Sequence, residues 1–337
     1  MEERKLTRAG NFSFTISLPK KWILNNKLSK GKSVFLTEKE EGILVSPKKE
    51  KYSPVPSRLK VNVDTSPYNG VVRDIVAGYL KNVETIEVHG KKLRKLALKL
   101  KEHISSFSGL EIIEETSERI LIKDLINLDE IIVPDLIRRI DIIIRSMLED
   151  TRGLLLKKDS NFAKSIYLRD KEINRLVFLV SKVINYINDR PNEGKLHGLN
   201  FKHTNYIWEM NGYLEKIGDE IKRIALLIPK LRCDKKEMKR IHEVFRETEG
   251  LYLEIMGAMY KNNIQKGDKA SAERTNVFSK IDDILKNSKN IKQSIILNKL
   301  KYIISFNNSI SRINRYILFE KHFVDGASIG TKKTIEE

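Results

Sequence analysis

From residue 134 onward, apolar residues recur with the 3.6-residue period of α-helices, and this periodicity restricts the possible folds more than any other feature. The stripes predict helices over residues 134–157, 162–188, 201–227, 235–261, 270–286 and 291–319. Helix-breaking residues mark the connectors, with Pro191 and Gly194 in the first half and Gly267 and Asp268 in the second. The sequence therefore predicts two tandem three-helix bundles, residues 128–230 and 231–325, followed by a tail over residues 326–337.

Upstream of these helices, strand and helix patterns alternate. Strands are expected over residues 59–63, 85–89, 110–115 and 119–123, and helices over residues 68–81 and 91–105. This order predicts a small α+β module, residues 51–127, of roughly ferredoxin-like or regulatory-domain order, whose last two strands form a hairpin. No catalytic constellation is found in it.

The first 50 residues predict a small β-rich domain. Residues 12–18 alternate apolar and polar side chains as a half-buried strand does, and Pro19 precedes a short helix over residues 20–28. A hairpin is expected from residues 33–37 and 42–46, followed by a linker that contains Pro54 and Pro56. A chain this short buries little apolar surface, so we expect it to dimerise.

Positive charge is concentrated in that first segment. The 337 residues include 63 Lys and Arg against 45 Asp and Glu, a net charge of +18. Residues 1–60 hold 14 basic and 6 acidic residues, a net of +8, whereas residues 61–127 hold 10 of each. Such a distribution fits a polyanionic partner for the N-terminal segment, and it fits simple solubility equally well.

Other classes of protein are disfavoured. The single cysteine, Cys233, excludes a disulfide scaffold and a multi-cysteine zinc site. The sequence has no apolar run of membrane-spanning length and no signal peptide, so we expect a cytoplasmic protein. It also lacks a P-loop, a dinucleotide-binding glycine motif, a nucleophile elbow and a His-Glu-x-x-His zinc motif, so we expect no enzyme.

The N-terminal segment resembles the SpoVT/AbrB family of swapped-hairpin DNA-binding domains. The resemblance lies in the run from Arg4 to Trp22 (RKLTRAGNFSFTISLPKKW) and in the run from Leu28 to Val34 (LSKGKSV). It implies an intertwined homodimer whose strands and basic loops lie on DNA. The side chains expected at the DNA are Arg4, Lys5, Arg8, Lys20 and Lys21.

The helical part resembles PhoU-type phosphate-uptake regulators. The resemblance lies in residues 214–225 (LEKIGDEIKRIA) and residues 168–178 (LRDKEINRLVF), and it is faint in the second half. It implies tandem three-helix bundles, in agreement with the periodicity. A swapped-hairpin domain joined to PhoU-like bundles resembles an archaeal type of regulator.

An acidic pair in the first bundle has the spacing of metal ligands. Glu215 and Asp219 are four residues apart, so both carboxylates leave one face of a helix. In PhoU-like proteins such acidic pairs bind metal. By position, the resemblance implies Asp170, Glu215 and Asp219 as ligands of a divalent or ferric ion in bundle 1.

Several departures count against that metal site. Asn174 replaces an acidic partner of Asp170, and Ser311 and Arg315 stand at the second-half positions that correspond to Glu215 and Asp219. An arginine at such a position repels a cation. The alternative, which these departures favour, is that the acids pair with nearby cations: Lys216, Lys222 or Arg223.

These patterns predict a DNA-binding regulator of phosphate homeostasis, with a dimeric basic domain on DNA and helical bundles as the effector part. The alternative is an adaptor that does not bind DNA. Such an adaptor would dimerise through its N-terminal domain and bind a phosphate transporter or a signalling protein through its bundles.

Overall fold

A computed structural model describes residues 3–10, 13–39, 42–47, 58–190, 197–288 and 290–324. Close contacts divide the chain into two compact units, Met1–Pro54 and Val55–Glu337. The predicted linker prolines Pro54 and Pro56, the connector residues Pro191 and Gly194, the boundary between residues 50 and 51, and the tail over residues 326–337 lie outside the described residues.

Unit 1 contains two small antiparallel hairpins and one short helix. Its elements are β1 (Thr7–Ala9), β2 (Ser13–Thr15), α1 (Lys20–Asn25), β3 (Phe35–Lys39) and β4 (Gly42–Ser46), with β1 paired to β2 and β3 paired to β4. The strand expected over residues 12–18 is shorter, because the described chain leaves the β1 pairing after Thr15. Gly10 lies after β1 with φ +78°, a conformation that glycine adopts without strain.

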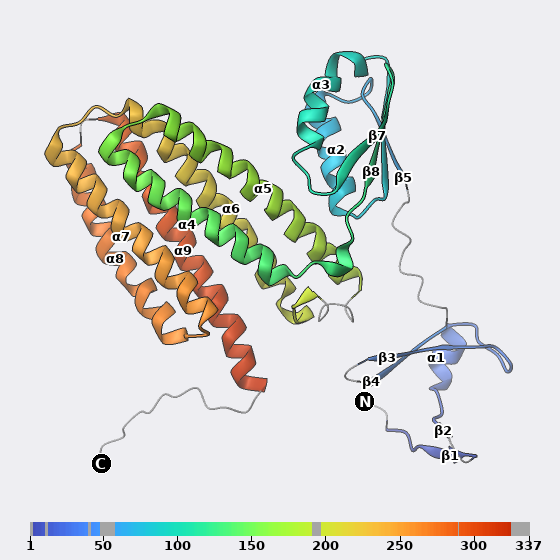
Figure 1. Cartoon of the computed structure of the whole chain (residues 1–337). Helices are drawn as coiled ribbons and strands as arrows, with labels where there is room; N and C mark the ends of the chain where they lie inside the picture. Colours follow the sequence, from blue (N-terminus) through green and yellow to red (C-terminus); the bar gives the residue numbers. More distant parts are fainter. Residues whose placement is uncertain are drawn as a thin grey trace, which may run out of the picture. The chain divides into compact units, whose positions relative to one another are not determined.

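Unit 2 begins with a four-stranded sheet and two helices. They are β5 (Arg58–Asn62), α2 (Tyr68–Leu80), β6 (Thr85–His89), α3 (Leu93–Ile104), β7 (Leu110–Glu115) and β8 (Arg119–Asp124), in the strand order β5-β6-β8-β7. The alternation Ile86/Val88 and Ile120/Ile122 places buried side chains on one sheet face, where α2 and α3 cover them (Figure 1). The predicted order of strands and helices is confirmed, including the closing hairpin of β7 and β8. The sheet differs from a ferredoxin-like one, because the consecutive strands β5 and β6 are direct neighbours.

Six long helices complete unit 2 and run alongside one another (Figure 1). They are α4 (Val133–Lys157), α5 (Ser160–Asp189), α6 (Thr204–Leu227), α7 (Lys235–Tyr260), α8 (Ile264–Lys286) and α9 (Ile291–Val324). Helices α4, α5 and α6 pack on one another, as do α7, α8 and α9, which confirms the predicted bundle architecture. Their buried apolar residues form one continuous hydrophobic cluster. Among the helices that the structure describes, none has the length and apolarity to cross a membrane.

Side-chain caps fix where several of these helices begin. Asp159 accepts hydrogen bonds from the amides of Asn161 and Phe162, so α5 begins at Ser160. Asp234 and Glu237 form a reciprocal capping box at the start of α7.

One helix begins six residues before its predicted start. Asn263 caps α8 by accepting a hydrogen bond from the amide of Lys266. Gly267 and Asp268, predicted as connector residues, therefore lie inside α8. Gly267 has a packing role there, since its carbonyl accepts a hydrogen bond from the buried Ser311 hydroxyl of α9 at 3.1 Å.

The two bundles contact each other through α4 with α7 and through α6 with α9. A buried polar cluster lies at the first of these interfaces. The Asp141 carboxylate of α4 accepts hydrogen bonds from Arg145 Nε at 2.9 Å and from the Tyr252 hydroxyl of α7 at 2.8 Å. Because a buried carboxylate is costly without partners, this cluster favours one alignment of α4 on α7.

The α+β module is joined to α5 by a buried ion pair. Lys182 is fully buried, and its ammonium group donates to the Tyr79 carbonyl oxygen at 3.0 Å and to the Asp124 carboxylate. Nearby, Asn185 donates to the Leu80 carbonyl oxygen at 2.9 Å. The ends of α2 and β8 therefore lie against the C-terminal part of α5.

Candidate functional site

The predicted metal ligands come together where α5 and α6 pack closely. Asp170 lies on α5, and Glu215 and Asp219 lie on α6. Between them, Gly218 lets the two helices approach, since a Cβ atom there would be 2.8 Å from Ile173 Cδ1. The same Cβ position would be 3.8 Å from Asp170 Oδ1, so the Asp170 carboxylate faces α6 at this glycine.

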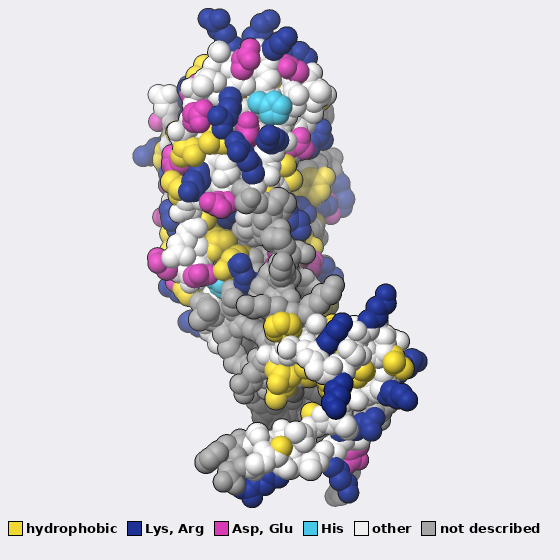
Figure 2. All heavy atoms as spheres, turned by 90° about the vertical axis from the view of Figure 1, so that its right-hand side faces the viewer, with side chains coloured by type: hydrophobic (Ala, Val, Ile, Leu, Met, Phe, Trp, Pro, Cys, Tyr) yellow, Lys and Arg dark blue, Asp and Glu magenta, His cyan; other side chains and the backbone are white. Residues whose placement is uncertain are grey.

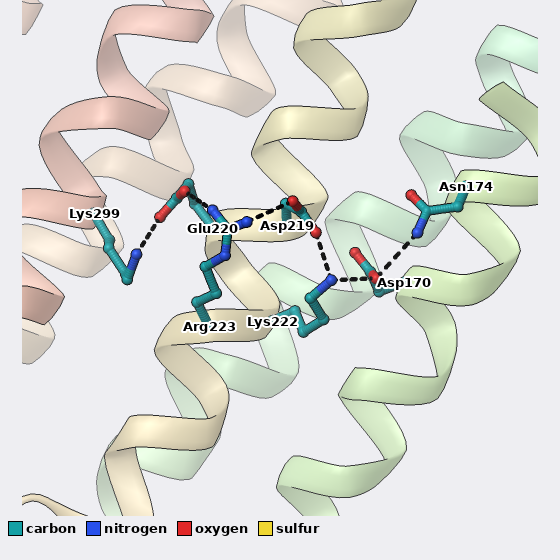
Figure 3. Close-up of polar contacts among 7 residues, drawn as sticks. All are labelled: Asp170, Asn174, Asp219, Glu220, Lys222, Arg223 and Lys299. Carbon is teal, nitrogen blue, oxygen red and sulfur yellow. Dashed lines mark hydrogen bonds and ion pairs between the residues drawn. The ribbon is translucent and has the colours of Figure 1, made fainter. Parts of the chain in front are cut away.

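A lysine ammonium group bridges two of these acids (Figure 3). Lys222 Nζ lies 2.6 Å from Asp170 Oδ2 and 2.5 Å from Asp219 Oδ1. The Asp170 side chain is buried, with a residue exposure of only 3%. Its other oxygen, Oδ1, has no hydrogen-bond partner within the described residues. Lys222 therefore holds a position where two carboxylates from different helices converge.

The ion pairs continue from α6 to α9 (Figure 3). Arg223 Nη2 lies 2.8 Å from Asp219 Oδ2, and the same guanidinium group pairs with Glu220. Lys299 of α9 donates to Glu220 Oε2 at 2.8 Å. The alternating charges thus connect α5, α6 and α9, and they link one bundle to the other.

Burial and mutual repulsion raise the pKa values of Asp170 and Glu215. Burial raises the pKa of Asp170, and the hydrogen bond and charge of Lys222 oppose that shift. Burial also raises the pKa of Glu215, and the charges of Asp219 and Asp170 raise it further. Burial alone lowers the pKa of Lys222, but hydrogen bonds to Asp170 and Asp219 outweigh this and raise it. Lys222 therefore carries its charge at neutral pH.

The structure contains ion pairs of the kind that the sequence offered as the alternative to a metal site. Lys222 and Arg223 pair with the acids, whereas Lys216 lies over the rings of Tyr213 and Phe306, at 5.2 and 5.8 Å from their centroids. Over the part of the chain that the structure describes, no group of three or more His, Cys, Asp or Glu side chains is arranged to hold a metal ion. A metal bound by Asp170, Glu215 and Asp219 remains a prediction.

The corresponding positions in the second bundle hold no acidic pair. Ser311 is buried against Gly267, and Arg315 forms an ion pair with Asp268 of α8. The arginine that the sequence placed at this position therefore has an acidic partner of its own.

The residues predicted to contact DNA all lie in unit 1 and are exposed: Arg4, Lys5, Arg8, Lys20 and Lys21. Arg8 Nε donates to the Gly10 carbonyl oxygen at 3.2 Å, within the β1–β2 turn. Lys20 and Lys21 occupy the first turn of α1. Figure 2 shows Lys and Arg side chains of this unit beside exposed hydrophobic side chains.

Sequence reasoning missed the polar groups that tertiary packing buries. Lys182 and Asp141 are ordinary charged residues in the sequence, and only packing against Tyr79 and Tyr252 gives them buried partners. His197 lies in the connector predicted between residues 188 and 201, where we expect a surface residue, but it is fully buried, with Nδ1 2.9 Å from the Ile131 carbonyl oxygen. For Lys182 and Asp141, the one available sign of burial in the sequence was their position between apolar residues of a helical stripe.

The acidic residues on α5 and α6 lie in a segment that matches a known protein domain. Residues 137–228 match the PhoU domain. This PhoU-domain segment covers most of α4 together with α5 and α6, and it includes Asp170, Glu215, Asp219 and Lys222. The remainder of the chain lies outside the match.

One solved structure resembles a larger part of the chain. It is the crystal structure of the phosphate transport system regulatory protein PhoU from Streptococcus pneumoniae, which is 14% identical in sequence. The similarity has a TM-score of 0.40 and covers 57% of this chain and 94% of that one. No curated protein matches the chain in sequence.

Proposed function

We propose that the chain is a PhoU-type regulator of phosphate uptake that acts by binding a phosphate transporter or a signalling protein through its helical bundles. The observation that carries the proposal is the match of residues 137–228 to the PhoU domain. The match falls on three helices whose buried apolar residues belong to the hydrophobic cluster of the six helices, so the segment presents a folded surface to a partner.

In this proposal the chain catalyses no reaction. Asp170 and Asp219 are engaged by Lys222, and Glu220 is engaged by Lys299 and Arg223. Carboxylates held in ion pairs of this kind stabilise the helix packing and are poorly placed to act as general acids or bases. Recognition of a partner protein is then the activity to be tested.

A second part of the proposal is that unit 1 forms a homodimer. Over residues 3–10, 13–36 and 42–47 of this unit, no residue is buried. The large apolar side chains exposed within these ranges are Leu6, Phe14, Ile16, Leu24, Phe35, Leu36, Ile43 and Leu44. Two thirds of the Phe14 surface is accessible, at 67%, which is unusual for an aromatic side chain of a folded domain. A second copy of the same unit supplies the missing apolar partner.

DNA binding by that dimer is the second candidate function. Lys20 and Lys21 stand at the N-terminus of α1, where a positive charge is unfavourable to the helix. Their presence there favours a role outside the helix, and phosphate groups of DNA are suitable partners. We therefore keep DNA binding as a candidate beside the adaptor function.

Phosphate uptake in cells tests the main proposal. Cells that lack the chain are expected to lose the difference in phosphate uptake rate between low and high phosphate supply, and the full chain supplied in trans should restore it. Uptake that follows phosphate supply equally well with and without the chain would contradict the proposal.

A binding assay tests the second candidate. The full chain with Arg8→Gln, Lys20→Gln and Lys21→Gln is compared with the charge-matched control Lys27→Gln, Lys30→Gln and Lys32→Gln in gel-shift titrations at several salt concentrations. Sequence-specific DNA binding should fall at least about tenfold in the first variant and its salt dependence should weaken. Equal binding by both variants would remove the DNA-binding assignment from these three residues.

A further inference from the structure

We propose that the Lys222 ammonium group is the resident cation of the acidic cluster on α5 and α6, and that removing its charge converts this cluster into a site for a divalent metal ion. The PhoU-domain segment of this chain is then independent of metal as it stands. The inference concerns these side chains alone and does not depend on the proposed function.

The position of Lys222 is that of a bridging cation. Its Nζ atom contacts one carboxylate oxygen from α5 and one from α6, at 2.6 and 2.5 Å (Figure 3). Asp219 lies on the same helix three residues earlier, whereas Asp170 is 52 residues away in the sequence. The ammonium group therefore neutralises the two acids from inside the protein. Without it, repulsion between the two carboxylates would oppose the packing of α5 on α6.

The same position excludes a metal ion. A divalent cation bound to Asp170 and Asp219 would lie within a few ångströms of the ammonium group and be repelled by it. Because Lys222 is covalently tethered beside its acidic partners, it competes at a high effective concentration that no free ion matches at ordinary supply.

Oxygen ligands would be available once the ammonium group is gone. Asp170 Oδ2 and Asp219 Oδ1 lose their partner, and Asp170 Oδ1 is buried and has none among the described residues. Asn174, whose amide nitrogen lies 3.4 Å from Asp170 Oδ2, has an unpartnered Oδ1 of its own. Carboxylate and amide oxygens are the ligands that hard divalent ions such as Mn²⁺ accept.

The charge balance also suits a divalent ion. The cluster holds four carboxylates and four cationic groups: Asp170, Glu215, Asp219 and Glu220 against Lys216, Lys222, Arg223 and Lys299. Removal of Lys222 leaves four negative and three positive charges, a net of −1 when all are ionised. Lys299 is meanwhile engaged with Glu220, on the side of α6 that faces α9, and Arg223 pairs with both Glu220 and Asp219 Oδ2.

The test is a measurement of bound Mn²⁺ on the full chain. Wild type, Lys222→Gln, the charge-keeping Lys222→Arg and the matched control Arg223→Gln are incubated with Mn²⁺, freed of unbound ion by gel filtration and analysed for manganese. Lys222→Gln should retain at least about tenfold more Mn²⁺ than the other three proteins, approaching one ion per chain. The further change Asp219→Asn should abolish that binding.

Two results would overturn the inference. One is wild-type protein that retains close to one Mn²⁺ per chain and loses it with Asp219→Asn. The other is a folded Lys222→Gln protein, judged by circular dichroism, that retains no more Mn²⁺ than wild type.

Thermal unfolding of the wild type keeps the inference testable if Lys222→Gln does not fold. Its melting temperature should be the same in Mn²⁺ as in a chelator, because an ion that does not bind the native state does not stabilise it. A melting temperature that rises in Mn²⁺ and no longer does so in Asp219→Asn would overturn the inference.

Discussion

A single carboxylate fixes the start of α3. Asp64 follows β5, and its Oδ2 and Oδ1 atoms accept hydrogen bonds from the amides of Lys91 and Lys92 at 2.8 and 2.9 Å. Hydrogen bonds from these two amides, Lys92 first, lower the pKa of Asp64 below its ordinary value of 3.8. The carboxylate therefore links the end of one strand to the helix that follows the next.

The pH dependence of stability tests this role of Asp64. Because its pKa is lower in the folded than in the unfolded protein, the ionised carboxylate stabilises the fold above about pH 4, and this contribution is lost as the pH falls through the folded pKa. Asp64→Asn should lower the melting temperature at pH 7, and the difference from wild type should shrink below about pH 4. The same change at exposed Asp74, which bonds neither amide, should have no such pH-dependent effect. A difference between Asp64→Asn and wild type that is constant with pH would contradict this account.

At the residue scale, the sequence predicted partners within one helix better than partners between helices. The spacing of Asp219 and Lys222 already allowed an ion pair on one helix face, and Lys222 was among the expected partners. The contact of Lys222 with Asp170 depends on the packing of α5 on α6 at Gly218, which no local pattern determines. Buried polar contacts of this kind are therefore found only in the folded structure.

At the scale of elements, periodicity predicted the bundle helices well because each buries a long apolar stripe. The error at α8 shows the limit, since glycine and aspartate in its first turns resembled a connector while Asn263 supplied the helix cap. The strand order of the α+β module was missed for a related reason. Alternating polar and apolar residues indicate a strand but not its neighbours, and β8 pairs with both β6 and β7.

Substitution of Lys182 tests how much its buried ion pair, which joins the α+β module to α5, contributes to the free energy of unfolding. Lys182→Met leaves the Asp124 carboxylate, whose side chain is 9% exposed, without its cation. Removing one partner of a buried pair typically costs about 3–5 kcal/mol, so we expect a loss of that order in the free energy of unfolding. Chemical denaturation measures it.

Two companion variants show whether the loss comes from the ion pair. The change Lys164→Met, at an exposed position of the same helix, should cost less than about 0.5 kcal/mol. Adding Asp124→Asn to Lys182→Met should recover part of the loss, because the buried carboxylate is no longer charged. Equal losses from Lys182→Met and Lys164→Met would mean that the buried pair contributes nothing.

At the scale of the whole molecule, the exposed apolar side chains of unit 1 predict a dimer in solution. Phe14→Asp and Ile43→Asp should each raise the dimer dissociation constant at least about tenfold, since burying such a side chain contributes about 1.5–3 kcal/mol. Leu98→Asp is the matched control, because Leu98 on α3 is similarly exposed, at 72% against 67% and 65% for Phe14 and Ile43. Sedimentation of the full chain measures all three. A wild-type monomer, or equal weakening by Leu98→Asp, would contradict dimerisation through unit 1.

The central claim is that the chain regulates phosphate uptake through contacts of its bundles with a partner protein. The most direct test is the phosphate uptake rate, at low and high phosphate supply, of cells whose only copy carries Arg8→Gln, Lys20→Gln and Lys21→Gln. The account predicts that uptake still responds to phosphate supply as in wild type, because the bundles are unchanged. Loss of that response in this variant, together with a normal response in the Lys27→Gln, Lys30→Gln and Lys32→Gln control, would contradict the claim and assign the regulation to the basic N-terminal unit.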